Sequence, residues 1–473
     1  MRKSELAHQP ITVLRELFRD GSFEPEDLLD CLLENIRRYE SKIHAYLHMV
    51  PEHTLREQAR DASKELKNFG SRPLTGIFMA IKDNTYVSGL PCTAGSKILE
   101  GYIPLKDATA VSRLREQGAV FLGKTNLDEF AAFGIATNNP HFGRTFNPWN
   151  LGRIPGGSSG GSAAAVSAGE AVAATGSDTG GSVRIPASFC NLVGLKPTFG
   201  RISRSGTITM SWTLDHFGVI ARTVRDASVL YEAMSGKDAS DSSTLNSPEL
   251  ERSAFADDPP DLFGIKLGIF SNPIRASDDG VMSCFDESVR VLSEAGARIR
   301  SIELPDVEHI TPAIFAIALS EVAAYHEEWF RTRREDYADT LRGYVQLGHT
   351  ILATEYLKAQ RARATIVERV SRKLAEVDVL LVPTNPSVAP ELNQEFVEIR
   401  GKRYPAFQVL TENTYPFNLL GLPAMTIPNG FSNGLPVGLQ LVCSHWKEDL
   451  LFKVGDCYQQ LTDYHKKTPA VPL

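Results

Sequence analysis

The sequence predicts an α/β protein with a largely buried sheet. Short apolar segments of strand length alternate with helical segments from Gly76 to about residue 230, and again from Ile265 onward. Strands buried on both faces are apolar throughout, so this alternation favours a sheet covered by helices. Of 473 residues, 42% are hydrophobic and 23% are charged. These values argue against disordered, collagen-like and disulfide-stapled chains.

The first 70 residues are expected to form a helical segment that packs on the main domain. Pro25, Glu26 and Asp27 suit a first helical turn, because proline is tolerated there and acids favour the positive helix end. Leucines repeat at helical spacing behind them. A second helix is predicted from about Glu52 to Gly70, since glycine is favoured just past a helix end.

The remaining elements follow from short apolar runs and helical periodicity. The predicted strands lie at 76–81, 119–123, 171–175, 265–270, 297–304, 377–383, 424–428 and 434–443. The predicted helices lie at 110–117, 283–295, most of 312–376 and 447–462. Residues 237–262 are polar and rich in Pro, Ser and Asp, which predicts a surface connection inside the fold, with a domain linker as the alternative.

Charge and cysteine content exclude several function classes. The formal net charge of −7 gives no electrostatic footprint for nucleic acid or for an anionic membrane surface. The longest apolar runs are too short to span a bilayer, and no apolar signal segment follows Met1. The six cysteines form no CxxC pair, so we expect buried thiols in a cytoplasmic protein.

Residues Gly118–Thr125 match the phosphate-binding pattern GxxxxGK[ST] letter for letter. We reject this match, because a P-loop needs a strand before the first glycine and a loop between the two glycines. Here the preceding segment is helical and the four intervening residues are apolar, as in a buried strand. Thr125–Asp128 is interpreted instead as a helix cap with an acid at its third position.

A Gly/Ser-rich segment spans Pro155–Ser162. A flexible linker is the simplest interpretation of such a segment, but the small apolar residues of Ala163–Ala168 follow at once and suit a tightly packed helix. A glycine-rich turn that opens a helix presents backbone N–H groups to an anion or an oxyanion.

The same segment contains GxSxG twice, centred on Ser158 and Ser159. This raises the nucleophile elbow of an α/β-hydrolase as an alternative. The elbow requires a strand running directly into the serine, which Ile154-Pro155 disfavours. It also requires a later acid and histidine, and no histidine here lies in an evident motif.

A second Gly/Ser cluster at Gly176–Pro186 follows another short apolar strand. Two such turns can bring two serines together at one end of the sheet, although each serine alone also suits a helix cap. Lys82 closes an apolar strand, and burial there would lower its pKa toward neutral. A nucleophile, a relay hydroxyl and a base without histidine would then be present together.

The run GGSSGGSAAAVSAG…GSDTGGSVRIPASFCNLVGLKPT resembles the amidase signature family. The resemblance extends from about Gly76 to Asp226 and again from Tyr415 to Gln440. It implies one large α/β/α domain over 71–473, with a mixed central sheet and helices on both faces. It also makes 237–262 a surface loop of that domain.

The resemblance assigns roles to individual residues. Ser182 is similar to the nucleophile that forms the acyl-enzyme, Ser158 to a middle serine that follows a cis peptide bond, and Lys82 to the base. The implied oxyanion donors are the backbone N–H groups of Thr179, Gly180, Gly181 and Ser182. The implied supporting network consists of Ser159, Asp178 and Arg184.

The choice of amide depends on one departure from a family pattern. The amidotransferase A subunits, to which Gly123–Phe130 and Gly421–Ala424 are similar, carry an Asp five residues before a proline, and this Asp holds the α-amino group of glutamine. Here the proline is Pro416 and the position is Thr411. A site without that carboxylate loses its partner for an ammonium group, which favours a stand-alone hydrolase. Two alternatives remain, a non-catalytic subunit of a larger complex and the glutaminase A subunit of a tRNA-dependent amidotransferase.

The expected acyl pocket is apolar, with Phe133, Gly134, Ile135, Met210 and Trp212 as its candidate residues. We therefore predict a small neutral substrate. The candidates are an aromatic amide, an anilide and a carbamate. The alternative is that Phe133, Met210 and Trp212 only fill the core. No metal-ligand spacing occurs, so no cofactor is expected. We expect a monomer or homodimer with no nucleic-acid or membrane partner.

Overall fold

The computed structural model describes residues 1–68, 72–250, 255, 261–272 and 276–471. Within these residues, eleven strands form one central sheet: β1 (Tyr46–Met49), β2 (Phe78–Lys82), β3 (Val120–Thr125), β6 (Ala173–Asp178), β7 (Val193–Lys196), β8 (His216–Ala221), β9 (Lys266–Phe270), β10 (Arg298–Ile302), β11 (Val379–Pro383), β14 (Ala424–Ser432) and β15 (Leu435–Cys443). Two short ladders lie outside it, β4 (Asn138–Asn139) with β5 (Gly143–Arg144) and β12 (Phe396–Ile399) with β13 (Lys402–Pro405).

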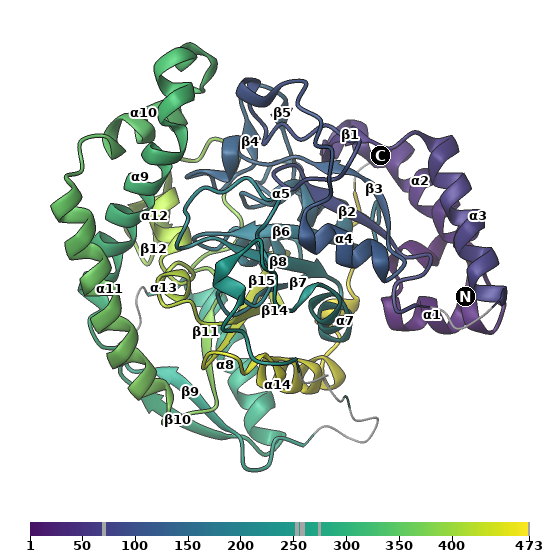
Figure 1. The fold of residues 1–473 in the computed structure, drawn as a ribbon. Helices are drawn as coiled ribbons and strands as arrows, with labels where there is room; N and C mark the ends of the chain where they lie inside the picture. The colour runs from purple at the N-terminus through teal and green to yellow at the C-terminus, as the bar shows by residue number, and fades with distance from the viewer. Residues whose placement is uncertain (69–71, 251–254, 256–260, 273–275, 472–473) are drawn as a thin grey trace.

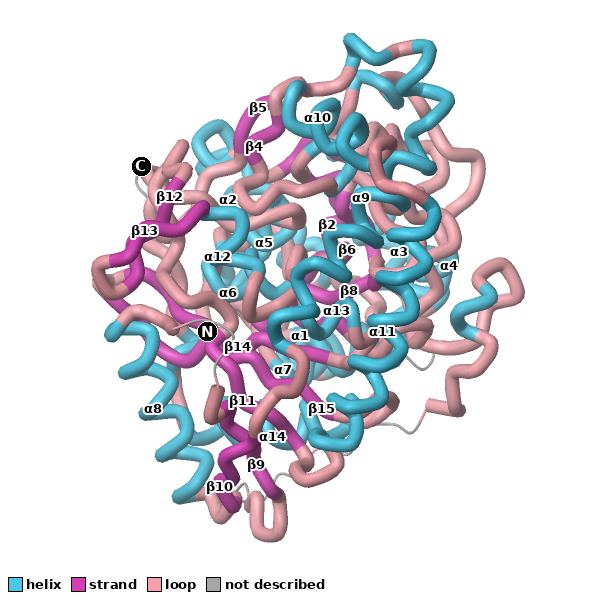
Figure 2. The backbone as a smooth tube through the Cα atoms, turned by 90° about the vertical axis from the view of Figure 1, so that its left-hand side faces the viewer, coloured by secondary structure: helices cyan, strands magenta, loops and turns pink. Residues whose placement is uncertain are grey.

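The sheet is mixed, in the order β1-β3-β2-β6-β8-β7-β14-β15-β11-β9-β10. Pairing is parallel in β3-β2-β6 and in β11-β9-β10, and antiparallel across the centre and at β1. Figure 2 follows the sheet from β9 and β10 at the bottom to β2 and β6 higher in the molecule. The predicted α/β class with a mixed sheet is confirmed.

The helices are α1 (Ile11–Arg19), α2 (Pro25–Ile43), α3 (Glu52–Asn68), α4 (Thr109–Glu116), α5 (Gly160–Ser167), α6 (Arg184–Phe189), α7 (Val224–Met234), α8 (Asp279–Glu294), α9 (Val307–Thr332), α10 (Asp339–Gly348), α11 (Ala353–Leu374), α12 (Ala406–Thr411), α13 (Pro416–Leu419) and α14 (Glu448–Leu461). They cover both faces of the sheet. Two residues of β15 show this arrangement. A Cβ added at Gly438 would meet Ser188 of α6, whereas Leu441 lies against Gly455 of α14. Successive strand residues point to opposite faces, so α6 and α14 lie on opposite sides of β15.

The N-terminal helices α1, α2 and α3 lie together at one edge of the molecule (Figure 1). The segment also contains strand β1, which the sequence analysis did not predict. Tyr46 of β1 pairs with Thr125 of β3 at the edge of the sheet. Four residues are too few to show a strand period, so only the tertiary pairing reveals this strand. The predicted helix end at Gly70 lies outside the described residues.

Helices α9, α10 and α11 lie along the opposite side of the molecule (Figure 1, green). They confirm the predicted helical character of 312–376. By length and composition α9 could cross a membrane. Its buried residues, among them Ile314, Ile317 and Val322, instead share a core cluster with residues of α10 and α11, as expected for a core helix of a globular protein.

The predicted surface connection 237–262 is described in part, since 251–254 and 256–260 lie outside the described residues. Its first half is tied to the main domain. The Asp238 carboxylate accepts hydrogen bonds from Thr109 and Ser203, both at 2.6 Å, and a short helical turn follows at Ser242–Thr244.

Candidate active site

Lys82 is the last residue of strand β2 and lies where the parallel strands β2 and β6 both end. All five residues of the strand are buried, and Lys82 has no exposed surface. Its Nζ donates to Ser158 Oγ at 2.8 Å and to Ser177 Oγ at 2.9 Å. Burial lowers the pKa of Lys82 to about 7, so its amine can take up and release a proton near neutral pH. The carboxylates that oppose this shift belong to Asp128, Asp178 and Asp215.

Ser158 lies in the loop that enters α5. The expected cis peptide bond is present between Gly157 and Ser158. The next residue joins the two glycine-rich turns, because the Ser159 N–H donates to the Ser182 carbonyl at 3.1 Å. The Ser159 hydroxyl donates to the Ser177 carbonyl at 3.3 Å. The two serine-containing turns therefore meet at one edge of the sheet, as the sequence predicts.

Ser182 lies in the turn between β6 and α6. It is partly exposed and lines a pocket, together with Thr179 and Gly180. Lys82 and Ser158 are fully buried and are not among the residues that line the pocket. Of the three residues predicted to act in catalysis, Ser182 is thus the one whose surroundings open toward a ligand.

Gly181 is not among the residues that line the pocket. Its φ is +124°, and a Cβ there would lie 2.3 Å from Thr414 Oγ1, so only glycine fits. The Gly181 N–H donates to Asp178 Oδ1 at 2.9 Å. This N–H is therefore occupied, which corrects the predicted set of four oxyanion donors. The remaining three, Thr179, Gly180 and Ser182, all line the pocket.

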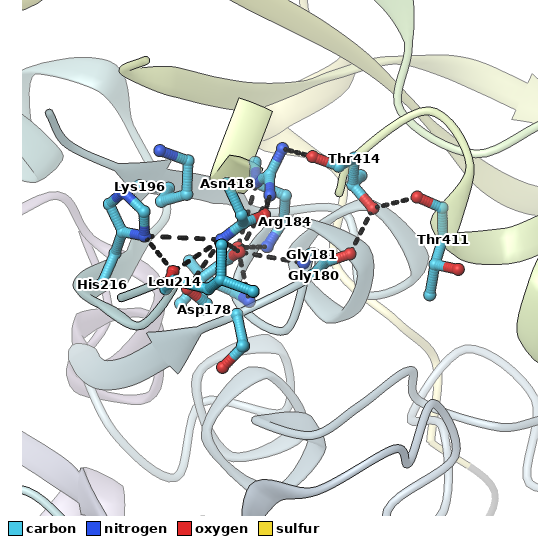
Figure 3. A network of polar contacts seen from close by, with 12 residues as sticks. Asp178, Gly180, Gly181, Arg184, Lys196, Leu214, His216, Thr411, Thr414 and Asn418 are labelled. Atoms are coloured by element: carbon cyan, nitrogen blue, oxygen red, sulfur yellow. Dashed lines mark hydrogen bonds and ion pairs between the residues drawn. The ribbon is translucent and has the colours of Figure 1, made fainter. Parts of the chain in front are cut away.

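Asp178 and Arg184, the residues on either side of the turn that contains Ser182, form a fully buried ion pair (Figure 3). The Arg184 Nη2 lies 2.8 Å from Asp178 Oδ1, and its Nε donates to Oδ2 at 3.0 Å. Burial disfavours the charged carboxylate, but the Arg184 guanidinium outweighs it and holds the pKa of Asp178 well below its usual range. Such a bidentate pair fixes the end of β6 relative to the start of α6.

The network continues into the C-terminal part of the chain, to Thr414 and Asn418, which the sequence analysis did not single out. Arg184 donates to the Thr414 carbonyl at 2.8 Å and to Asn418 Oδ1 at 2.7 Å. The Thr414 hydroxyl donates to the Gly180 carbonyl at 2.6 Å. Figure 3 shows Thr414 between Arg184 and Thr411. The one indication in the sequence was that Asn418 falls inside the 415–440 segment of the family resemblance.

The pocket beside Ser182 is apolar. Its lining consists of Ala131, Phe133, Gly134, Ile135, Gly157, Thr179, Gly180, Ser182, Ile185, Met210, Leu214, Ile314, Phe315, Ala318, Phe407, Thr411 and Tyr415. Among the described residues, no charged side chain contributes to this wall. A pocket of this kind favours a neutral, apolar acyl group, because a charged one would lose its hydration without a partner.

Four of the five predicted pocket residues, Phe133, Gly134, Ile135 and Met210, line this pocket. Trp212 does not, and this prediction is wrong: the residue is 69% exposed. The carboxylate of Glu321 on α9 accepts hydrogen bonds from Ser211 and Thr213 on either side of it, which leaves the indole facing outward.

Sequence reasoning missed the far wall of the pocket. Ile314, Phe315 and Ala318 come from α9, and Phe407 comes from α12. Phe133 stacks on Tyr344 of α10 with ring centroids 4.1 Å apart. These helices follow Ser182 by more than 100 residues, and their apolar faces look like ordinary core in the sequence.

Two interpretations of the segment 118–128 have different outcomes. The rejection of a P-loop is supported, since Lys124 lies inside strand β3 and its Nζ is 3.0 Å from Asp83 Oδ1 in a fully buried ion pair. The predicted helix cap at Thr125–Asp128 is wrong. Thr125 ends the strand, and the Asp128 carboxylate makes no cap bond to the short turn Glu129–Ala131. It accepts the N–H groups of Thr137 and Asn138 instead.

Comparison with known proteins agrees with this site. Residues 27–452 match the Amidase family. The chain is 39% identical over 482 residues to the A subunit of the glutamyl-tRNA(Gln) amidotransferase of Roseiflexus castenholzii, covering 97% of this chain and 96% of that protein. It is 38% identical over 464 residues to the protein of the same name from Microcystis aeruginosa, covering 93% and 94%.

Solved structures show the same fold across nearly the whole chain. The A subunit of the glutamyl-tRNA(Gln) amidotransferase of Thermotoga maritima superposes with a TM-score of 0.80 at 34% identity, covering 98% of each chain. A chain from a vestigial protein complex linked to the origins of an s-triazine catabolic enzyme superposes with a TM-score of 0.87 at 31% sequence identity. The match covers 98% of this chain and 100% of that chain. A 6-aminohexanoate cyclic dimer hydrolase with bound substrate superposes with a TM-score of 0.86 at 27% sequence identity, covering 98% of this chain and 99% of that chain.

Proposed function

Because the chain belongs to the amidase family, we propose that it hydrolyses a carboxylic amide through an acyl-enzyme on Ser182. The observation that supports this most directly is the buried contact of 2.8 Å between Lys82 Nζ and Ser158 Oγ. Gly157, the residue before Ser158, lines the same pocket as Ser182. The contact between Lys82 and Ser158 supplies a base and a relay hydroxyl to a serine that faces a ligand site.

The proposed reaction has two halves. Neutral Lys82 accepts the Ser158 proton, Ser158 accepts the proton of Ser182, and the Ser182 Oγ attacks the amide carbon. The backbone N–H groups of Thr179, Gly180 and Ser182 stabilise the negative oxygen of the tetrahedral intermediate. The proton returns along the same path to the leaving amine as the C–N bond breaks. Water then attacks the Ser182 ester in the same way and releases the acid.

For the substrate, we propose a neutral amide with an apolar or aromatic acyl group. The wall of the pocket is uncharged, and Thr411 occupies the position at which the amidotransferase A subunits carry an Asp. The Thr411 hydroxyl donates to the Phe407 carbonyl at 2.9 Å, so it is engaged with its own helix. A free ammonium group would meet no carboxylate in this wall.

The second candidate is the glutaminase A subunit of a tRNA-dependent amidotransferase. Sequence similarity favours it over a stand-alone hydrolase, since the relatives at 38–39% identity bear the name of that amidotransferase component. This candidate requires partner subunits, whereas the first acts as a monomer or homodimer in the cytoplasm. A non-catalytic role is opposed by the contact between Lys82 and Ser158.

The deciding experiment uses the purified chain, whose size in solution is also measured, and follows release of the leaving group from a panel of amides and a carbamate. The leaving group is ammonia for glutamine, benzamide and phenylacetamide, aniline for an anilide and phenol for an aryl carbamate. We expect aromatic and aliphatic neutral amides to be cleaved well above glutamine. Glutamine as the best substrate, with activity dependent on partner subunits, would establish the second candidate. Absence of cleavage of every substrate together with unreactive Ser182 would reject both.

A further inference from the structure

Asp128 is a buried carboxylate that none of the proposed steps uses. It is 8% exposed and lies between two glycines that line the pocket. A Cβ added at Gly157 would be 2.3 Å from its Oδ2, and one added at Gly134 would be 2.0 Å from its Cγ. The side chain therefore fills the space between the pocket loop and the peptide that precedes Ser158.

Hydrogen bonds accepted by Asp128 and made by Thr137 connect this loop to the turn around Ser158. Its two oxygens accept the N–H groups of Thr137 and Asn138, each at 3.1 Å. The Thr137 hydroxyl donates to the Gly156 carbonyl at 2.9 Å and accepts the Gly160 N–H at 3.0 Å. Thr137 itself has a φ of +47°, a conformation that a non-glycine residue keeps only when its surroundings hold it.

The charge of Asp128 acts on Lys82. Of the three carboxylates that face this lysine, Asp128 has the largest effect. Asp178 is paired with the Arg184 guanidinium. Asp215 accepts hydrogen bonds from Thr179 and from the N–H groups of the 210–211 turn, and it faces the cation of Arg204. Among the ion pairs of the described residues, Asp128 has no partner within 4.0 Å, so Lys82 is the cation that experiences its field.

We propose that Asp128 is a positioning residue for acylation, which holds the 134–138 loop against Gly157–Ser158 and stabilises the Lys82 ammonium that forms when Ser182 attacks. This inference rests on the proposed function, in which Lys82 is the base. Burial raises the pKa of Asp128 to about 6, so its carboxylate is charged in the range where Lys82 titrates.

The test measures the labelling rate of Ser182 by a fluorophosphonate between pH 5 and 9. The proteins compared are the wild-type chain, Asp128→Asn, Asp128→Ser and Thr137→Val. In the wild type the rate rises with pH as Lys82 loses its proton. Removing the anion lowers the pKa of Lys82, so in both Asp128 variants the rise moves to lower pH by about one unit, and the plateau falls about tenfold or more.

Thr137→Val is the matched control, since it removes the hydroxyl links to Gly156 and Gly160 but keeps the charge. Its plateau falls while its rise stays at the wild-type pH. A rise at the wild-type pH in the Asp128 variants overturns the proposal, as does failure of both Asp128 variants to fold, which would make the role structural. If the wild type is not labelled at Ser182, the proposed function itself fails. If the wild type is labelled and the Asp128 variants have the same rates and pH dependence, only the inference about Asp128 fails.

Discussion

The Nζ of Lys82 lies 2.8 Å from the Oγ of Ser158, although 76 positions separate the two residues. Strand β2, which ends at Lys82, runs parallel to its neighbour β6, so both strands point their carboxyl ends to the same edge of the sheet. The loop before α5 passes over this edge and places Ser158 there. The proposed base and relay hydroxyl are thus positioned by the sheet rather than by a local motif.

Replacing the proposed nucleophile should abolish the reaction. Ser182→Ala removes the oxygen that forms the acyl-enzyme, so we expect turnover to fall by about 10⁴-fold or more and fluorophosphonate labelling to disappear. Intact-mass spectrometry of the labelled protein checks this result. Ser240→Ala, at an exposed position, is the control and should retain full labelling. A label that persists on another serine would contradict the assignment.

The pH dependence of kcat/KM should report the buried lysine. Burial lowers the pKa of Lys82 to about 7, and only its neutral amine can accept a proton, so activity should rise with pH through about 7 and then level off. Lys82→Met should be nearly inactive at every pH, with Ser158→Ala less impaired. An activity that falls as pH rises through 7 would show that the protonated lysine is the active form.

A carboxylate at position 411 should change the preferred substrate. Thr411→Asp places an anion in the pocket wall, where it can pair with the ammonium group of glutamine. We expect kcat/KM for glutamine to rise about tenfold or more, and that for phenylacetamide to fall. Steady-state kinetics with both amides measure the switch. Thr411→Asn, of similar size and neutral, should not gain glutamine activity. Equal gains in both variants would show that size rather than charge matters.

The apolar wall should determine affinity for aromatic acyl groups. Phe133→Ala removes a ring that lines the pocket, so we expect KM for aryl amides to rise by about 10- to 100-fold, the equivalent of losing the burial of one large side chain. Trp212→Ala is the control, since Trp212 is 69% exposed, and its KM should remain within about twofold. A larger effect of Trp212→Ala than of Phe133→Ala would place the acyl group elsewhere.

The buried ion pair should be needed for stability. Arg184→Met leaves the Asp178 carboxylate buried without its cation, which is expected to lower the free energy of unfolding by about 3–5 kcal/mol. Urea denaturation followed by circular dichroism measures this change. Arg290→Met removes an exposed arginine of α8 paired with Glu287 and should leave the denaturation midpoint almost unchanged. Similar midpoints for both variants would contradict a structural role of the Asp178–Arg184 pair.

Local sequence chemistry predicted the parts of the site that depend on backbone conformation. Twelve of the 36 glycines fall between Gly152 and Gly206. Glycine at 181 is required by a positive φ and by the nearness of Thr414. Such requirements exclude every other residue, so they are visible in the sequence without knowledge of the fold. The strand ending at Lys82 was visible for a similar reason, because its apolar run stops at a charged residue.

Tertiary structure alone decided what surrounds these turns. Ile314 and Phe407 on the pocket wall have the same apolar character as core residues, and burial against a ligand or against a neighbouring helix leaves the same pattern in a sequence. Asp128 was interpreted as the acid at the third position of a helix capped at Thr125, because the spacing fits such a cap. Its partners, Thr137 and Gly157, come from a loop and a turn whose approach is set by the packing of β3 and α5. The sequence indicated the proposed reacting groups, because the glycine-rich turns and the strand that ends at Lys82 are local features. The structure determined the pocket, since contact between distant segments is settled only when the chain packs.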